Sequence, residues 1–131
     1  MSDSITHDAA VRYAAALTDG RTDSLLAMLA DSAQFQSPFT LWDDPAGVGA
    51  AYAARATAFT DLVVLEVVAQ GDRAVLLWRA DVSGRLVEGC EVLTLSRAEV
   101  LRVDVYLRPA AVLSDVHAAM KAAWPREPRR R

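Results

Sequence analysis

The sequence predicts an α+β fold in which a strongly curved antiparallel sheet wraps around helices and closes over an apolar pocket. Helical periodicity dominates the N-terminal half, whereas four strand-like runs separated by hairpin-length turns follow it. The charges on those runs favour one strand register, which keeps every ionic side chain except that of Glu91 out of the interior.

Length and composition predict one domain. The chain has 131 residues, of which 53% are hydrophobic, enough to bury a core without disulfides. We place a single domain at residues 6–123 and expect a disordered basic tail at 124–131. The net charge of −3 gives no general attraction for nucleic acid.

The chain also lacks the patterns of exported or metal-binding proteins. No apolar run approaches the ~20 residues of a membrane span, and the N-terminus does not resemble a signal peptide. Cys90 is the single cysteine, and no cluster of His, Asp or Glu has metal-ligand spacing. We therefore expect a cytoplasmic protein with no metal, no cofactor and no nucleic-acid or membrane partner.

Two helices and a short strand are predicted at the N-terminus. A stripe at i, i+3, i+4 and i+7 indicates the first helix, capped by Thr6, with these residues buried: Ala10, Tyr13, Ala14 and Leu17. A second helix, capped by Thr22 or Asp23, is expected to bury these residues: Leu25, Leu26, Met28 and Leu29. Alternation at 33–37 predicts a short strand that stops at Pro38.

The middle and the end of the chain add two more helices. An alanine-rich helix at about 47–59 has this face: Val48, Tyr52, Arg55 or Ala56, and Phe59. A last helix at about 110–123 has the following face: Leu113, Val116, His117 and Met120.

Between these helices lies a predicted four-strand meander. The strand runs are 62–69, 73–82, 85–96 and 100–108. Turns at Gly71-Asp72 and Ser83-Gly84, and a three-residue loop at 97–99, set the register.

That register places Leu76 and Val105 opposite Glu91, and Gly89 opposite Trp78. It also places Leu65 opposite Trp78, and Leu101 opposite Leu95. The predicted inner face is Val63, Leu65, Val67, Ala69, Ala74, Leu76, Trp78, Ala80, Val87, Gly89, Glu91, Leu93, Leu95, Leu101, Val103, Val105 and Leu107. A shift by one residue would bury Arg102, Asp104 and Arg108, at several kcal/mol per unpaired ion.

Glu91 is the charged residue on this inner face. We expect its carboxyl group to lie inside the apolar enclosure, within reach of the Tyr13 hydroxyl or a bridging water. It is either a ligand-contacting acid or a structural carboxyl satisfied by Tyr13 or water. Tyr13 is correspondingly either a core tyrosine or a pocket hydroxyl, whereas Trp42 and Trp78 are expected to be pocket walls.

The outer face of the predicted sheet is too apolar for a surface left in water. Its apolar residues are Val64, Val68, Val75, Leu77, Val92 and Tyr106. We therefore expect a homodimer that pairs the outer sheet faces of two copies.

The order of elements resembles the nuclear transport factor 2-like superfamily, whose cystatin-like α+β barrel is a curved sheet around a long helix. The stretches at 11–17 and 25–38 are similar to the opening of ketosteroid isomerases and SnoaL-like proteins. This resemblance implies that Tyr13 corresponds to the tyrosine of an oxyanion hole, and Glu91 to a protonated acid beside it. The general base of those isomerases falls on Ser37, and the catalytic aspartate of SnoaL-like cyclases falls on Val105, so neither base is present.

We interpret the chain as a SnoaL-like protein that binds a small hydrophobic molecule in an apolar conical pocket, with Tyr13 and Glu91 as polar groups. The expected pocket residues are Phe35, Ser37, Trp42, Tyr52, Phe59, Trp78, Val103 and Val105. One alternative is an isomerase, dehydratase or cyclase that uses Tyr13 and Glu91 on a hydrophobic, oxygen-bearing substrate. Another is a dimeric association domain with a vestigial pocket.

Overall fold

The computed structural model describes residues 3–126. Most of the predicted basic tail therefore lies outside the described residues. The helices are α1 (Asp3–Thr18), α2 (Thr22–Met28), α3 (Pro45–Ala58), the 3₁₀ turn η1 (Ala110–Val112) and α4 (Leu113–Ala123). The strands are β1 (Leu29–Gln36), β2 (Leu41–Trp42), β3 (Thr60–Gln70), β4 (Arg73–Val82), β5 (Arg85–Ser96) and β6 (Glu99–Arg108).

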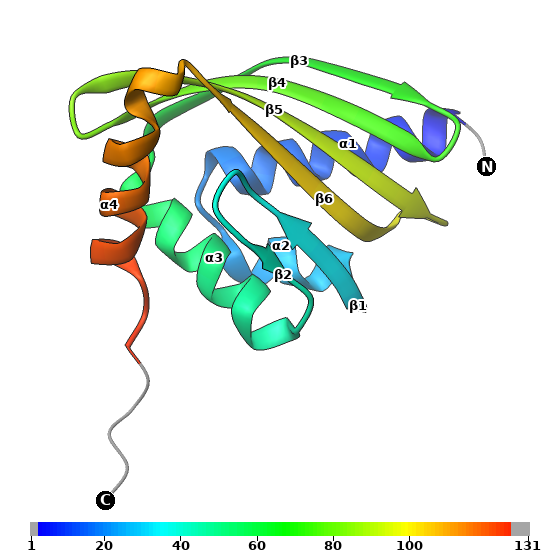
Figure 1. Cartoon of the computed structure of the whole chain (residues 1–131). Coiled ribbons are helices and arrows are strands. Elements are labelled where there is room, and N and C mark those ends of the chain that lie inside the picture. Colours follow the sequence, from blue (N-terminus) through cyan, green and yellow to red (C-terminus); the bar gives the residue numbers. More distant parts are fainter. Residues whose placement is uncertain (1–2, 127–131) are drawn as a thin grey trace, which may run out of the picture.

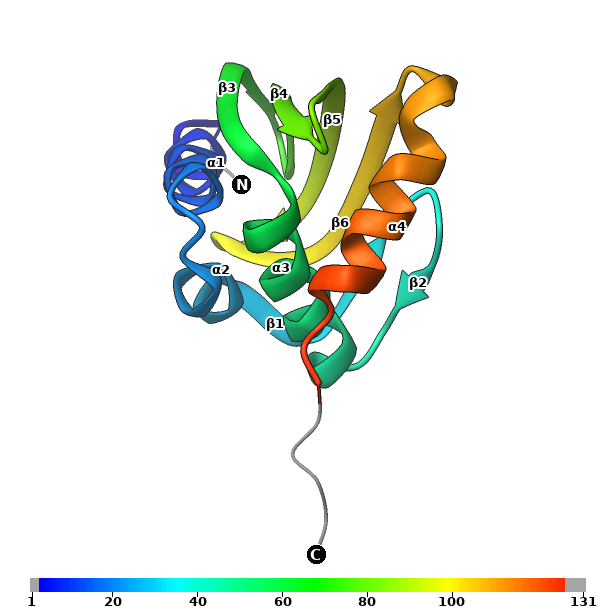
Figure 2. The ribbon, with the colours of Figure 1, turned by 90° about the vertical axis from the view of Figure 1, so that its left-hand side faces the viewer.

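One strongly curved sheet carries the fold, as predicted. Its strand order is β2-β1-β6-β5-β4-β3, and every neighbouring pair is antiparallel except β1 and β6. The sheet bends over α1 and α3, while α4 closes one end of the enclosure (Figures 1 and 2). Within residues 3–126, no helix is both long and apolar enough to cross a membrane.

The β4–β5 hairpin has the predicted register. Ser83 (φ 53°) and Gly84 (φ 79°) both adopt the left-handed conformation that a two-residue type I′ turn requires. Trp78 therefore lies opposite Gly89 and Leu76 opposite Glu91. The interior positions of both strands are buried, which confirms the predicted inner face for this part of the sheet.

The first half of β3 corrects the prediction. Val64, and not Leu65, lies opposite Trp78, because the register shifts between Val64 and Glu66. A bulge adds one residue to an edge strand and turns the preceding side chains over. Val64 therefore packs against the core, whereas Val63 and Leu65 are 44% and 56% exposed.

The start of β6 differs from the prediction for a related reason. The turn contains two residues, Arg97 and Ala98, which both have positive φ although neither is glycine. Val100 consequently pairs with Leu95 and is fully buried, whereas Leu101 is 38% exposed. A register shift between Thr94 and Leu95 then restores the predicted pairing of Val103 with Leu93 and of Val105 with Glu91.

The N-terminal elements are also shifted from their predicted ends. Thr6 is no cap, since α1 begins at Asp3 and the Thr6 hydroxyl donates to the Gly71 carbonyl oxygen at 2.6 Å. Asp3 accepts a hydrogen bond from the Gly71 amide, so the β3–β4 turn anchors the start of α1. Leu29 begins β1 rather than ending α2, and within α2 only Leu25 is buried.

The close contact between the Trp78 ring and Gly89 yields a prediction about stability. A Cβ atom at Gly89 would overlap the Trp78 ring, so Gly89→Ala should lower the free energy of unfolding by roughly 1–3 kcal/mol. Gly49→Ala is a matched control, because its Cβ would meet Leu26 at an ordinary 3.4 Å and alanine favours the helix. Urea denaturation measures both variants, and equal stabilities would contradict the packing argument.

Candidate functional site

The Glu91 carboxylate lies fully buried on β5, where three side-chain donors surround it. Tyr13 donates to Oε2 at 2.7 Å, and the Trp78 indole donates to Oε1 at 2.9 Å. The Arg55 Nη2 group also donates to Oε1 and forms a buried ion pair with it. Arginine and tryptophan have no acceptor to offer, so Glu91 accepts hydrogen bonds in this cluster.

Helix α3 supplies two members of the cluster from one face. Asp44 caps this helix through the Gly47 amide, and Pro45 occupies its first turn. Tyr52 and Arg55 are three residues apart and therefore point in the same direction. The Tyr52 hydroxyl lies 2.5 Å from that of Tyr13, which extends the cluster to a fifth hydrogen-bonding side chain.

Burial and charge shift the pKa values within this cluster. Burial first, and then the charge of Glu91, raises the pKa values of Tyr13 and Tyr52 well above their usual range. Burial alone would lower the pKa of Arg55, but the charge and hydrogen bond of Glu91 outweigh it and raise that pKa. Both tyrosines are therefore neutral and Arg55 is cationic near neutral pH.

The thiol of Cys90 follows the same pattern on the other side of β5. Burial, and then the Glu91 charge, raises its pKa. A raised thiol pKa disfavours the nucleophilic thiolate at neutral pH.

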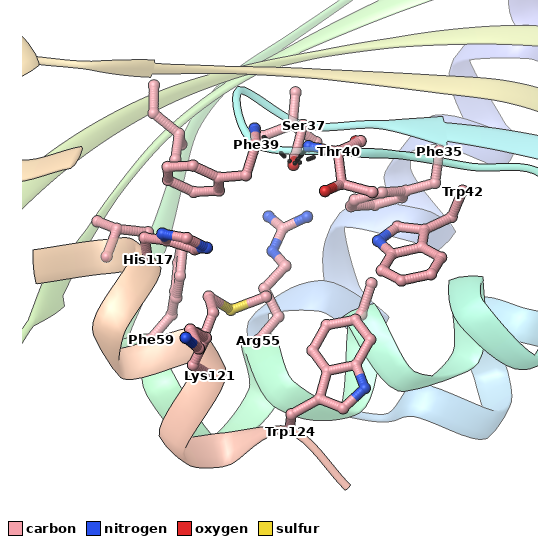
Figure 3. Close-up of a pocket in the computed structure, with 15 residues that line it drawn as sticks. Phe35, Ser37, Phe39, Thr40, Trp42, Arg55, Phe59, His117, Lys121 and Trp124 are labelled. Atoms are coloured by element: carbon pink, nitrogen blue, oxygen red, sulfur yellow. Dashed lines mark hydrogen bonds between the residues drawn. The ribbon is translucent and has the colours of Figure 1, made fainter. Parts of the chain in front are cut away.

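A cavity of about 380 Å³ lies beside this cluster, between α3, α4, β6 and the turn that joins β1 to β2. Its apolar boundary is formed by Phe35, Phe39, Trp42, Ala51, Phe59, Val105, Leu107, Val116, Met120 and Trp124. Its polar boundary is formed by Ser37, Thr40, Arg55, His117 and Lys121 (Figure 3).

Aromatic ring contacts join residues from different elements in the cavity boundary. The Trp42 and Trp124 rings lie 5.3 Å apart, and the Phe39 ring stacks on His117 at 4.8 Å. Trp42 also packs on Gly47, where a Cβ atom would overlap its ring. These contacts join the end of α4 to the β2 and α3 region, and they place Trp124 within the wall.

The structure brings five of the predicted pocket residues to this cavity: Phe35, Ser37, Trp42, Phe59 and Val105. The other five are buried but do not bound it: Tyr13, Tyr52, Trp78, Glu91 and Val103. Tyr52 instead borders a smaller hollow, which Arg55 and Phe59 also line. A role of any of these side chains toward a ligand stays a prediction.

Ser37 occupies the position where the resemblance implies a general base. Its hydroxyl oxygen accepts hydrogen bonds from the amides of Phe39 and Thr40 at 3.1 and 3.2 Å. These bonds stabilise the tight turn between β1 and β2 (Figure 3).

Arg55 is the partner of Glu91 that sequence reasoning missed, and the cavity boundary also contains residues that were not predicted there, among them Phe39, Lys121 and Trp124. The helical face was predicted to present either Arg55 or Ala56, and the partner of Glu91 was sought among hydroxyl groups and water. A buried carboxylate normally requires a cation, and Arg55 was the cation on an otherwise apolar helix face. That combination was the sequence signal that could have identified the Arg55–Glu91 pair.

Among the described residues, no group of three or more His, Cys, Asp or Glu side chains is placed to hold a metal ion.

Comparison with known proteins assigns the fold to a family. The family model for the SnoaL-like domain matches residues 10–106. No functionally curated protein matches the sequence.

Similar solved structures share the fold at low sequence identity. An uncharacterised protein with a cystatin-like fold from Silicibacter pomeroyi has a TM-score of 0.83 and 20% identity, with 88% of this chain and 84% of that chain covered. A steroid delta-isomerase from Pseudomonas aeruginosa has a TM-score of 0.81 and 18% identity, with coverages of 91% and 90%. A de novo designed protein with a curved β-sheet has a TM-score of 0.77 and 11% identity, with coverages of 93% and 99%. At these identities the likeness establishes the fold alone.

The buried ion pair yields a second prediction. Arg55→Met should lower the free energy of unfolding by about 3–5 kcal/mol, because it leaves Glu91 buried without its cation. Arg55→Met/Glu91→Gln should cost less than the single variant, since it leaves no unpaired buried charge and the amide oxygen can still accept from one of the two remaining donors, Tyr13 or Trp78. Arg85→Met serves as the control, because Arg85 forms an exposed pair with Asp115 and such pairs contribute about 0–1 kcal/mol. Urea denaturation decides, and a double variant less stable than Arg55→Met would contradict the argument.

Proposed function

The chain belongs to the family of SnoaL-like domains, and we propose that it binds a small hydrophobic molecule in the cavity between α3, α4 and β6. The observation that carries this proposal is a hollow of about 380 Å³ with ten apolar residues at its boundary. Its volume falls within the ~300–1,000 Å³ typical of small-molecule sites.

The distribution of polar groups also supports a binding role. The polar side chains of the boundary are few, and none of them is acidic. Few, well-placed polar groups in an apolar hollow orient a ligand while its apolar body provides most of the affinity. Tyr13 and Glu91 act on such a ligand through Arg55, which contacts both Glu91 and the cavity.

An isomerase, dehydratase or cyclase is the alternative that the Tyr13–Glu91 hydrogen bond favours. It places a neutral phenol beside the Glu91 carboxylate near a cavity, at the two positions that the resemblance associates with an oxyanion hole. Ser37 replaces the general base, however, and general base catalysis contributes roughly 10²–10⁴-fold. Turnover of a β,γ-unsaturated ketosteroid by the wild type, measured by the absorbance of the conjugated α,β-unsaturated ketone, would favour this alternative over simple binding.

A self-association surface on the convex face of the sheet is a separate proposal, and it applies whether or not the cavity is used. Apolar side chains remain exposed there, which favours pairing with a second copy: Val63, Leu65, Val68, Leu77 and Tyr106. Leu77, Cys90 and Tyr106 form one cross-strand row through this face. The ion pairs of Arg108 with Glu88 and of Arg102 with Asp104 supply a polar rim.

The binding proposal predicts saturable uptake of an uncharged hydrophobic dye. N-phenylnaphthylamine should bind the wild type with enhanced fluorescence. Val105→Phe should weaken that binding about tenfold, because the larger ring occupies cavity volume. Leu101→Phe on the same strand is the control, since Leu101 is exposed. Equal dye affinities for the two variants would argue against this cavity as the binding site.

The association proposal predicts a homodimer in solution. Light scattering at micromolar concentration should give about twice the 14.2 kDa chain mass. Leu77→Asp places an unpaired charge within the surface and should yield monomers. Ile5→Asp is the control, because Ile5 is 48% exposed on α1, away from this face. A wild-type mass equal to one chain would refute the proposal.

A further inference from the structure

The hydrogen bonds of the Glu91 cluster use the donors of both tyrosines and of the tryptophan. Tyr13 has a single hydroxyl proton, which it donates to Glu91. The short contact between the two tyrosine hydroxyls therefore requires Tyr52 to donate to Tyr13. The indole proton of Trp78 is likewise donated to Glu91, so neither tyrosine nor the tryptophan has a proton left for a ligand.

Arg55 retains a donor that nothing in the protein uses. Its Nη2 group binds Glu91, whereas its Nη1 group is buried and has no hydrogen-bond partner. The rings of Phe59 and Trp78 lie 5.5 and 5.1 Å from the guanidinium carbon and hold it in place without accepting an N–H bond along its plane. A buried donor without a partner is costly, and such groups generally meet one in the functional state.

The unused donor belongs to a group that points into the cavity. Figure 3 shows the guanidinium at the centre of the lining side chains, directed toward the turn that contains Ser37 and Thr40. The Ser37 hydroxyl is engaged within that turn, where its proton is directed to the Thr40 carbonyl oxygen at 3.4 Å. An acceptor supplied by a ligand is therefore the natural partner for Nη1.

The charge balance around Arg55 selects the kind of acceptor. Glu91 already neutralises the guanidinium, so a ligand carboxylate beside Nη1 would add a second anion that shares one buried cation. An uncharged carbonyl oxygen accepts the same hydrogen bond without adding charge. The remaining apolar boundary requires that the rest of the molecule be hydrophobic.

We propose that Arg55 Nη1 donates a hydrogen bond to the uncharged carbonyl oxygen of a hydrophobic ketone, ester or amide held in this cavity. Tyr13, Tyr52 and Glu91 are then positioning residues that fix the guanidinium, rather than groups that touch the ligand. This inference rests on the ligand-binding function proposed above, and it identifies the chemical class of the ligand.

Isothermal titration calorimetry with three naphthalenes of similar size tests the inference. The probes are β-acetylnaphthalene, β-isopropenylnaphthalene, in which a methylene group replaces the carbonyl oxygen, and β-naphthoate. The wild type should bind the acetyl compound about tenfold more tightly than the isopropenyl compound, as expected for one charge-assisted hydrogen bond. It should bind the naphthoate more weakly than the acetyl compound.

Two variants isolate the contribution of Arg55. Arg55→Met/Glu91→Gln removes both charges together and should bind the acetyl and isopropenyl compounds with equal affinity. Its retained binding of the isopropenyl compound would show that the cavity remains folded. Arg85→Met, which removes an exposed arginine, should keep the full tenfold preference.

The outcomes separate this inference from the binding function itself. Equal wild-type affinities for the acetyl and isopropenyl compounds would overturn the role of Arg55 while leaving a hydrophobic binding site. Tightest binding of the naphthoate would overturn the uncharged acceptor, and so would a double variant that keeps the acetyl preference. Failure of all three probes to bind the wild type would overturn the ligand-binding function and this inference together.

Discussion

The buried carboxylate of Glu91 constrains much of the rest of the molecule. An ion on the concave side of a closed sheet is costly unless its charge and lone pairs are matched. Here the matching donors come from three separate elements: Tyr13 from α1, Arg55 from α3 and Trp78 from β4. Both helices are thereby fixed to one point on β5, and the cavity forms in the space that α3 leaves beside β6 and α4. Such a network gives positional specificity even where its net contribution to stability is small.

The sequence predicted the centre of the sheet well and its edges less well. In the part of β4 next to the turn, Arg79 and Asp81 alternate with apolar residues, and Ser83-Gly84 favours one turn geometry, so a single register satisfies both signals. In β3 the run Leu62–Leu65 is apolar at every position, so alternation cannot specify which side chains point inward. The bulge after Val64 makes that choice. At Arg97 and Ala98 the backbone adopts a conformation that neither side chain favours, so the sequence predicted a loop at this point but not its two-residue geometry.

The sequence predicted the buried acid of the candidate site, but not its arginine partner or the complete cavity wall. A lone acid on an apolar strand face was enough to predict the burial of Glu91. Of the two partners expected for its carboxyl group, the Tyr13 hydroxyl or a bridging water, the structure contains the Tyr13 hydrogen bond. Its pairing with Arg55 joins residues 36 positions apart, and helical periodicity alone does not decide whether Arg55 or Ala56 faces inward. The cavity walls depend on contacts still more distant in sequence, such as that between Trp42 and Trp124. Local patterns carry no information about which rings meet there.

Because Glu91, a residue of the protein itself, balances the charge of Arg55, the ion pair affects which molecules the cavity can bind. If Arg55 lacked Glu91, its cation would have to be neutralised by the ligand, and only anions would bind without a large desolvation cost. Because Glu91 balances it from within the fold, the guanidinium can offer a donor to the cavity without demanding a charge in return. The two tyrosines strengthen this arrangement, since burial keeps them neutral while Tyr13 donates its proton to the same carboxylate. A directional donor whose own charge is balanced within the fold, in a largely apolar enclosure, selects occupants by the placement of an uncharged acceptor oxygen.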